Sequence, residues 1–150
     1  PSTLRKPYSV KMMGFWTLNG DVGDLSPIQY ILKGLEAYTI AEALGVPIES
    51  IEAVPTDGLD IIPGGSDEDQ LGLSYPELDK VIIELLKNNY NGEDNYLNVE
   101  MITKDISKKL FIKHEKVKKI ANQMMKTNYK RNWPHVFKRN DIGLKELDKI

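Results

Sequence analysis

Residues 74–87, SYPELDKVIIELLK, carry the clearest structural signal in the chain. Ser74 and Glu77 match a capping box, in which each side chain bonds the other residue's backbone N–H, and Pro76 suits a first helical turn. Apolar side chains then recur three and four positions apart and predict one buried face: Leu78, Val81, Ile82, Leu85 and Leu86. The sequence NNYNG at 88–92 ends this helix. These residues are therefore expected to pack along one side against the rest of the protein.

A second helix is expected upstream, within residues 26–44. Its apolar positions also recur at three and four: Ile28, Ile31, Leu32, Leu35, Tyr38, Ala41 and Leu44. Gly45 supplies a left-handed stop, and Pro47 prevents continuation. The start of the helix stays open, because SPIQ at 26–29 fits a capping box whereas residues 24–28 equally fit a short buried strand.

The segment from 55 to 72 lacks any period and is rich in Gly, Pro and acidic residues. A stretch of this length is typical of a lid or a binding loop. Gly64 and Gly65 do not indicate a phosphate loop, because no long buried strand precedes them and acidic residues follow. The better interpretation is a loop followed by a capped helix start at Asp67.

Two further helices are expected at 101–110 and 114–125, both with basic polar faces. Their spacing is also that of a helix-turn-helix, so a basic nucleic-acid-binding module in residues 101–150 is an alternative function. Against it, the turn lacks Gly, and the second helix begins with His114 rather than a base-reading Arg, Asn or Gln.

The amino-acid composition excludes several kinds of functional site. The chain has 150 residues, a formal net charge of −2 and no cysteine, which excludes disulfides, thiolate zinc sites and thiol catalysis. Residues 1–100 carry 6 basic and 17 acidic side chains, and residues 101–150 carry 14 and 5. This asymmetry fits either a nucleic-acid arm or the faces of an anionic-substrate site. Neither a membrane-length apolar run nor a signal peptide is visible, and a cytoplasmic location is expected.

Three segments, taken in order, resemble a known family. The first is GFWTLNGDVGDLSPI at 14–28 with Lys33 after it; the second is PTDGL at 55–59 with SDEDQLG at 66–72, Tyr75 and Asp79; the third is YKR at 129–131 before Pro134. Together they resemble the C-terminal half of NAD synthetase, an ammonia-using enzyme of the adenine nucleotide α-hydrolase-like superfamily. The similarity covers nearly all of the chain and is weakest from 88 to 112.

The resemblance implies a reaction and a set of binding residues. In that family ATP, with Mg²⁺, adenylylates the nicotinate carboxylate of deamido-NAD, and ammonia then displaces AMP to give NAD. By similarity, Lys33 and Thr56 would contact ATP, and Asp24, Tyr129 and Lys130 would contact deamido-NAD. No catalytic residue and no metal ligand is assigned. A cytoplasmic homodimer is the implied assembly.

Departures from the family pattern shape the expected domain. The Ser-Gly-Gly-X-Asp-Ser ATP-pyrophosphatase signature is absent. Leu18 stands where many members carry a lysine, and no metal-binding Glu occurs among residues 8–10. We therefore expect residues 1–150 to be the C-terminal part of an NAD synthetase domain, inactive without its N-terminal half. The implied fold is α/β and Rossmann-like, with this segment mostly α and holding one or two short parallel strands.

Overall fold

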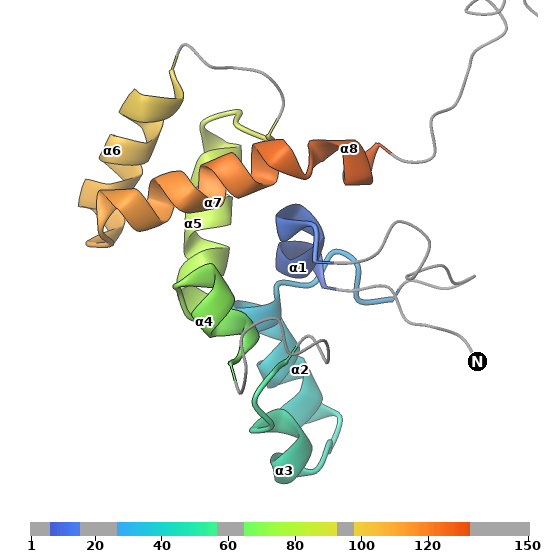
Figure 1. The fold of residues 1–150 in the computed structure, drawn as a ribbon. Coiled ribbons are helices and arrows are strands. Elements are labelled where there is room, and N and C mark those ends of the chain that lie inside the picture. The colour runs from blue at the N-terminus through green and yellow to red at the C-terminus, as the bar shows by residue number, and fades with distance from the viewer. Residues whose placement is uncertain (1–6, 16–26, 57–64, 93–97, 133–150) are drawn as a thin grey trace, which may run out of the picture.

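The structure, a computed structural model, describes residues 7–15, 27–56, 65–92 and 98–132, and this part of the chain is helical (Figure 1). In chain order its helices are α1 (Tyr8–Met13), the π-helix η1 (Lys33–Ala37), α2 (Tyr38–Ala43), α3 (Ile48–Ile51), α4 (Asp67–Leu71), α5 (Tyr75–Lys87), α6 (Val99–Leu110), α7 (His114–Lys126) and α8 (Asn128–Arg131). None of them is long and apolar enough to span a membrane.

The mostly helical character expected of this segment is confirmed, but the described residues contain no strand. Of the alternative strand at 24–28, residues 24–26 lie outside those described, and Pro27 and Ile28 lie in a turn. A short strand is stable only when a neighbouring strand bonds its backbone groups. No such neighbour exists within the described ranges.

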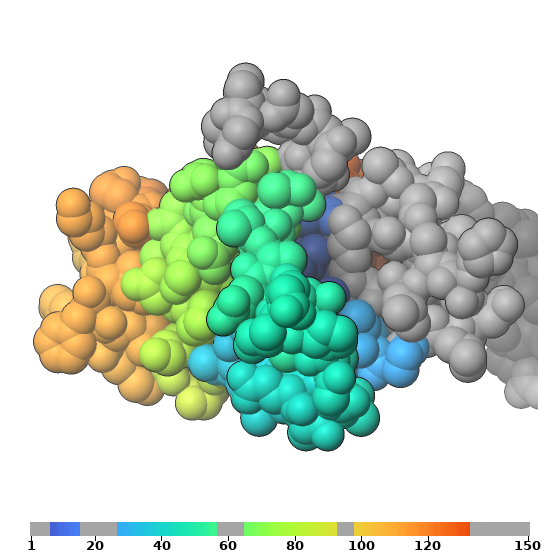
Figure 2. All heavy atoms as spheres, turned by 90° about the horizontal axis from the view of Figure 1, so that it is seen from below, coloured from blue at the N-terminus to red at the C-terminus, as the bar shows by residue number. Residues whose placement is uncertain are grey.

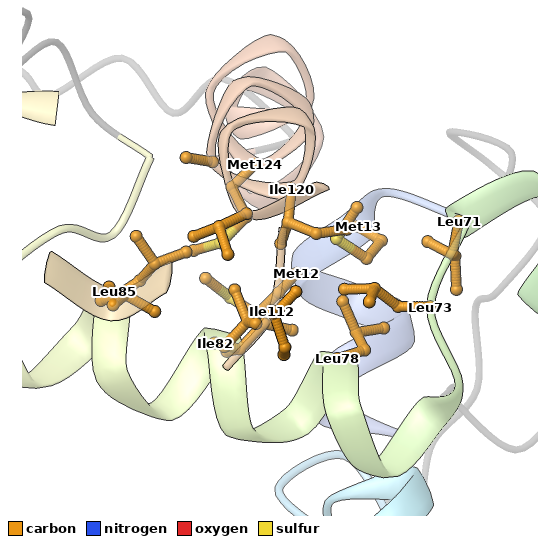
Figure 3. Packing of buried hydrophobic residues seen from close by; sticks show 14 of the residues in the cluster. Met12, Met13, Leu71, Leu73, Leu78, Ile82, Leu85, Ile112, Ile120 and Met124 are labelled. Atoms are coloured by element: carbon orange, nitrogen blue, oxygen red, sulfur yellow. The ribbon is translucent and has the colours of Figure 1, made fainter. Parts of the chain in front are cut away.

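Helix α5 is the centre of the core, as its sequence predicts. Both bonds of the capping box between Ser74 and Glu77 are present, and the helix runs to Lys87. Its apolar face meets α7 and α1, as Figure 3 shows for Leu78, Ile82 and Leu85. The apolar stripe of α7 is fully buried on the other side: Val117, Ile120, Ala121 and Met124. Full burial of one such aliphatic side chain contributes about 1.5–3 kcal/mol.

The predicted helix at 26–44 is corrected in two respects. It begins at Lys33, after a turn over residues 27–30, and opens with the π-helix η1 before α2. Its end agrees with the prediction, since Gly45 has φ 72°. Its apolar face, however, is not buried: η1, α2 and α3 contain no buried residue.

Residues 33–54, which we call the arm, therefore extend from the core (Figures 1 and 2), and several of their apolar side chains are exposed. Leu44 is 77% exposed, and others are exposed to a lesser degree: Leu35, Ile40, Val46, Ile48 and Val54. The same surface carries four exposed glutamates and no Lys or Arg after Lys33: Glu36, Glu42, Glu49 and Glu52. The stripe was predicted correctly as a pattern, but the described residues bury it only in part.

The arm joins the core where η1 crosses the start of α5. Asp79 of α5 accepts hydrogen bonds from the backbone N–H groups of Gly34 at 2.6 Å and Leu35 at 3.0 Å. A Cβ atom on Gly34 would lie 2.2 Å from the backbone nitrogen of Pro76. Glycine is needed here because the two backbones approach too closely for any side chain.

Candidate functional site

Lys33, expected to contact ATP, lies where four helices meet. It is the first residue of η1, and its backbone N–H donates to Ser9 Oγ of α1 at 3.2 Å. Its ammonium lies 3.8 Å from Asp67 Oδ2 and 3.9 Å from the ring centre of Tyr75. The side chain is 20% exposed. It therefore offers a partly accessible positive charge held at the starts of α4 and α5.

Asp67 and Tyr75, which both contact the Lys33 ammonium, are hydrogen-bonded to each other. The Tyr75 hydroxyl donates to Asp67 Oδ2 at 2.7 Å, and both residues are buried. Burial, followed by this bond to a carboxylate, raises the pKa of Tyr75 far above its ordinary value. The phenol consequently stays protonated and remains a donor to Asp67.

Thr56, the second residue expected to contact ATP, is exposed and reaches the same corner of the molecule. The carbonyl of Pro55, its neighbour, accepts the backbone N–H of Asp67 at 2.9 Å. Asp67 thus faces Lys33 through its carboxylate, and its backbone N–H bonds the residue before Thr56.

Asp79 fixes the backbone of the lysine rather than its side chain. Its Oδ2 accepts from Gly34 and Leu35, the two residues after Lys33. Burial raises the pKa of Asp79, opposed by hydrogen bonds from Ser9 and from those two backbone groups. This carboxyl therefore positions the first turn of η1.

Lys130 and Tyr129, expected to contact deamido-NAD, lie at the other end of α1. The Lys130 ammonium donates to the carbonyl of Gly14 at 2.8 Å, at the end of that helix. Tyr129 is 52% exposed. Arg131 of α8 joins α1 to α7 by donating to the carbonyls of Met12 at 2.9 Å and Met124 at 2.7 Å.

Helix α1 therefore links the two predicted binding regions, since Ser9 contacts the backbone of Lys33 and Gly14 contacts the side chain of Lys130. Asp24, the remaining predicted residue, lies outside the described residues. A shallow hollow between α1, α4 and α7 contains none of the predicted residues, and it is lined by Met13, Phe15, Gln70, Leu71, Lys119, Ile120 and Gln123. Within the described ranges, Lys33 faces Asp67, whose backbone bonds the residue before Thr56, whereas Lys130 contacts the end of α1 at Gly14.

The family model described as NAD synthase matches residues 7–134. The chain belongs to the NAD synthase family. Its relatives include an NH(3)-dependent NAD(+) synthetase of Thermoplasma acidophilum, 28% identical over 130 residues, and one of Archaeoglobus fulgidus, 30% identical over 132 residues. A third, from Methanopyrus kandleri, is 40% identical over 76 residues.

The extent of these matches agrees with a partial domain. The first two cover 85% and 87% of this chain but 44% of each relative, and the third covers 50% and 26%. The chain thus spans less than half the length of the relatives it matches. The resemblance to one half of an NAD synthetase, inferred from its motifs, is confirmed.

Within this NAD synthase segment, the roles of Asp67, Tyr75 and Asp79 were not predicted from sequence. All three lie in the motifs that carry the family resemblance, so their positions were visible but their partners were not. A carboxylate thirty-four residues after a lysine has no periodic relation to it. Only the fold places Asp67 beside Lys33.

The described part of the chain holds no cluster of metal-binding side chains. It contains no group of three or more His, Asp or Glu side chains that could hold a metal ion. Residues 8–10, where the family's glutamate is expected, form the start of α1 and include no carboxylate.

Proposed function

We propose that this chain forms the C-terminal half of an ammonia-dependent NAD synthetase that converts deamido-NAD to NAD. The family match over residues 7–134 carries the proposal. In the reaction, the nicotinate carboxylate attacks the α-phosphorus of ATP and pyrophosphate leaves. Ammonia then adds to the carbonyl carbon of the acyl-adenylate and AMP leaves, so that an amide replaces the carboxylate.

The residues of this chain suit a positioning role in both steps. Lys33 would neutralise charge on the ATP phosphates, and Thr56, at the same end of α4, would donate a hydrogen bond to ATP. Asp24, Tyr129 and Lys130 would hold deamido-NAD. Catalysis of this kind rests on orientation and electrostatic stabilisation rather than on a nucleophile in the protein. Excluding water from the acyl-adenylate protects it from hydrolysis.

The second half of the enzyme is the expected partner. The exposed apolar surface of the arm supports this, because monomeric proteins rarely leave a contiguous apolar patch uncovered. An N-terminal ATP-pyrophosphatase half would cover it, supply the parallel sheet of the α/β domain and complete the ATP site. Without it the chain is expected to be inactive. A homodimer in the cytoplasm remains the expected assembly.

The alternative, nucleic-acid binding by residues 101–150, has less support. Among the described residues of this region, Lys118 pairs with Glu100 at 2.9 Å and Lys109 pairs with Glu84. Lys119 donates to the carbonyl of Gln70 at 2.7 Å. These three lysines therefore form ion pairs or hydrogen bonds within the protein. Duplex binding would be recognised by an affinity that falls steeply with salt.

The test combines this chain with the N-terminal half of the Archaeoglobus fulgidus relative. We expect ATP and deamido-NAD each to raise the melting temperature at moderate salt, and NAD to form when ammonium is added. Lys33→Gln should weaken the response to ATP, whereas Lys116→Gln, on the exposed face of α7, should leave it unchanged. If neither nucleotide changes the melting temperature and the chain binds duplex with salt-sensitive affinity, the NAD synthetase proposal is wrong and nucleic-acid binding is the function.

A further inference from the structure

The ammonium of Lys33 is held by groups from two helices other than its own. It faces Asp67 Oδ2 of α4 at 3.8 Å and the ring of Tyr75 of α5 at 3.9 Å. Fixing a lysine side chain in one position costs conformational entropy. A defined position therefore requires contacts of this kind.

Asp67 is itself oriented toward the lysine. Its Oδ2 accepts the Tyr75 hydroxyl at 2.7 Å, and its side chain is 12% exposed. Its other oxygen, Oδ1, is buried and has no hydrogen-bond partner among the described residues. A buried carboxylate with an unsatisfied oxygen is costly unless a nearby positive charge stabilises it. Lys33 supplies that charge.

A purely local role in starting α4 does not explain this carboxylate. Ser66 and Asp69 already form the complete capping box of that helix, with bonds of 2.8 Å from Ser66 N to Asp69 Oδ2 and 3.1 Å from Asp69 N to Ser66 Oγ. Asp67 takes no part in it. Its side chain instead reaches across to Tyr75 and Lys33, on different elements of the fold.

The distance between the Lys33 ammonium and the Asp67 carboxylate allows the ammonium to bind a ligand. At 3.8 Å the ammonium attracts Asp67 Oδ2 without a direct N–H···O hydrogen bond to it. A phosphate oxygen arriving at the exposed side of Lys33 would offer a shorter, charge-assisted bond. Asp67 and Tyr75 would then keep the lysine stem in place behind it.

We propose that Asp67 and Tyr75 are positioning residues that hold the Lys33 ammonium at the starts of α4 and α5 to meet a phosphate of ATP. The inference rests on the proposed function for its ligand. Its structural part, the coupling of Asp67 to Lys33, is testable without nucleotide.

The first experiment measures competitive acetylation of lysines by trace acetic anhydride, read by mass spectrometry, on this chain alone. Removing the neighbouring negative charge favours the neutral amine, so Asp67→Asn should raise Lys33 labelling about fivefold. Tyr75→Phe keeps the ring but loses the hydroxyl that orients Asp67 toward Lys33, so the carboxylate should move away and Lys33 labelling should rise about twofold. Lys80 and Lys116 serve as internal standards, and Asp69→Asn on the same helix is the matched control. Unchanged Lys33 labelling in folded Asp67→Asn and Tyr75→Phe protein would overturn the inference.

The second experiment measures NAD formation with the N-terminal half present. Asp67→Asn should raise the KM for ATP about fivefold with kcat within about twofold, because positioning is weakened and the reacting groups remain. Asp67→Glu should restore part of the loss. If Lys33→Gln raises the KM for ATP and Asp67→Asn does not, the positioning inference is wrong. If neither Lys33→Gln nor Asp67→Asn changes it, the assignment of ATP to Lys33 fails, whatever the labelling shows.

Discussion

The core helices and the arm have similar sequence patterns and opposite environments. In α5 and α7 the apolar stripe is buried, and Tyr75, Leu78, Val117 and Ile120 have no exposed surface. In η1, α2 and α3 the equivalent stripe has no buried residue. Helical periodicity therefore shows which face of a helix is apolar, but it does not show whether the same chain supplies the partner that covers it.

The junction between the two regions is built from polar and backbone contacts. Gly34 allows η1 to approach the backbone of α5, and Asp79 accepts the N–H groups that follow Lys33. These contacts align the candidate lysine without burying the arm. Variants in the core, at the junction and on the arm should therefore affect stability to very different degrees.

The largest effect is expected in the core. Leu85→Ala removes a side chain with no exposed surface from the face of α5 that packs against α7. The lost contacts and the resulting cavity should lower the free energy of unfolding by about 3 kcal/mol. Urea unfolding followed by circular dichroism measures this change. A loss below about 1 kcal/mol would show that α5 is not the centre of the cooperative unit.

The next effect is expected at the junction. In Gly34→Ala the new methyl would lie 2.2 Å from Pro76 N and 2.3 Å from the carbonyl carbon of Tyr75. Overpacking against backbone should cost about 2 kcal/mol. Hydrogen exchange should show faster exchange in residues 33–43 while α7 stays protected. Equal loss of protection in both regions would mean that arm and core unfold together.

Asp79→Ala tests the polar part of the junction. Its effect on the free energy of unfolding should depend on pH. Losing the acceptor for Gly34 and Leu35 should cost about 2 kcal/mol. Because burial raises the pKa of Asp79, the folded protein retains this proton at a pH where the unfolded chain has released it. The stabilisation by Asp79 is thus fully present below the unfolded pKa and declines as pH rises through the folded value. Denaturation at about pH 4 and about pH 7 should show the larger loss at the lower pH.

The smallest effect is expected on the arm. Leu44→Ala changes a side chain that is 77% exposed at the end of α2. With little buried area to lose, the free energy of unfolding should change by less than about 0.5 kcal/mol. The same variant measured with an N-terminal half present sharpens the comparison. A larger loss there would show that the partner covers this face.

Local signals predicted much of this protein. The capping box of α5, the stop at Gly45, the bounds of α6 and α7 within two residues and the stripes of both core helices all follow from residues close in sequence. The family resemblance also rested on the sequence, since its motifs are contiguous. These features depend on backbone preference and on side chains within one or two turns.

The sequence by itself thus determined helices α5, α6 and α7, the family and the candidate residues Lys33 and Thr56. Only the tertiary structure decided that Asp67 and Tyr75 flank the lysine, that α1 lies between Lys33 and Lys130, and that the arm is buried only in part. The physical reason is the distance along the chain over which each interaction acts. Capping and periodicity act over a few residues, whereas the position of a charge depends on packing between helices that are tens of residues apart in the chain.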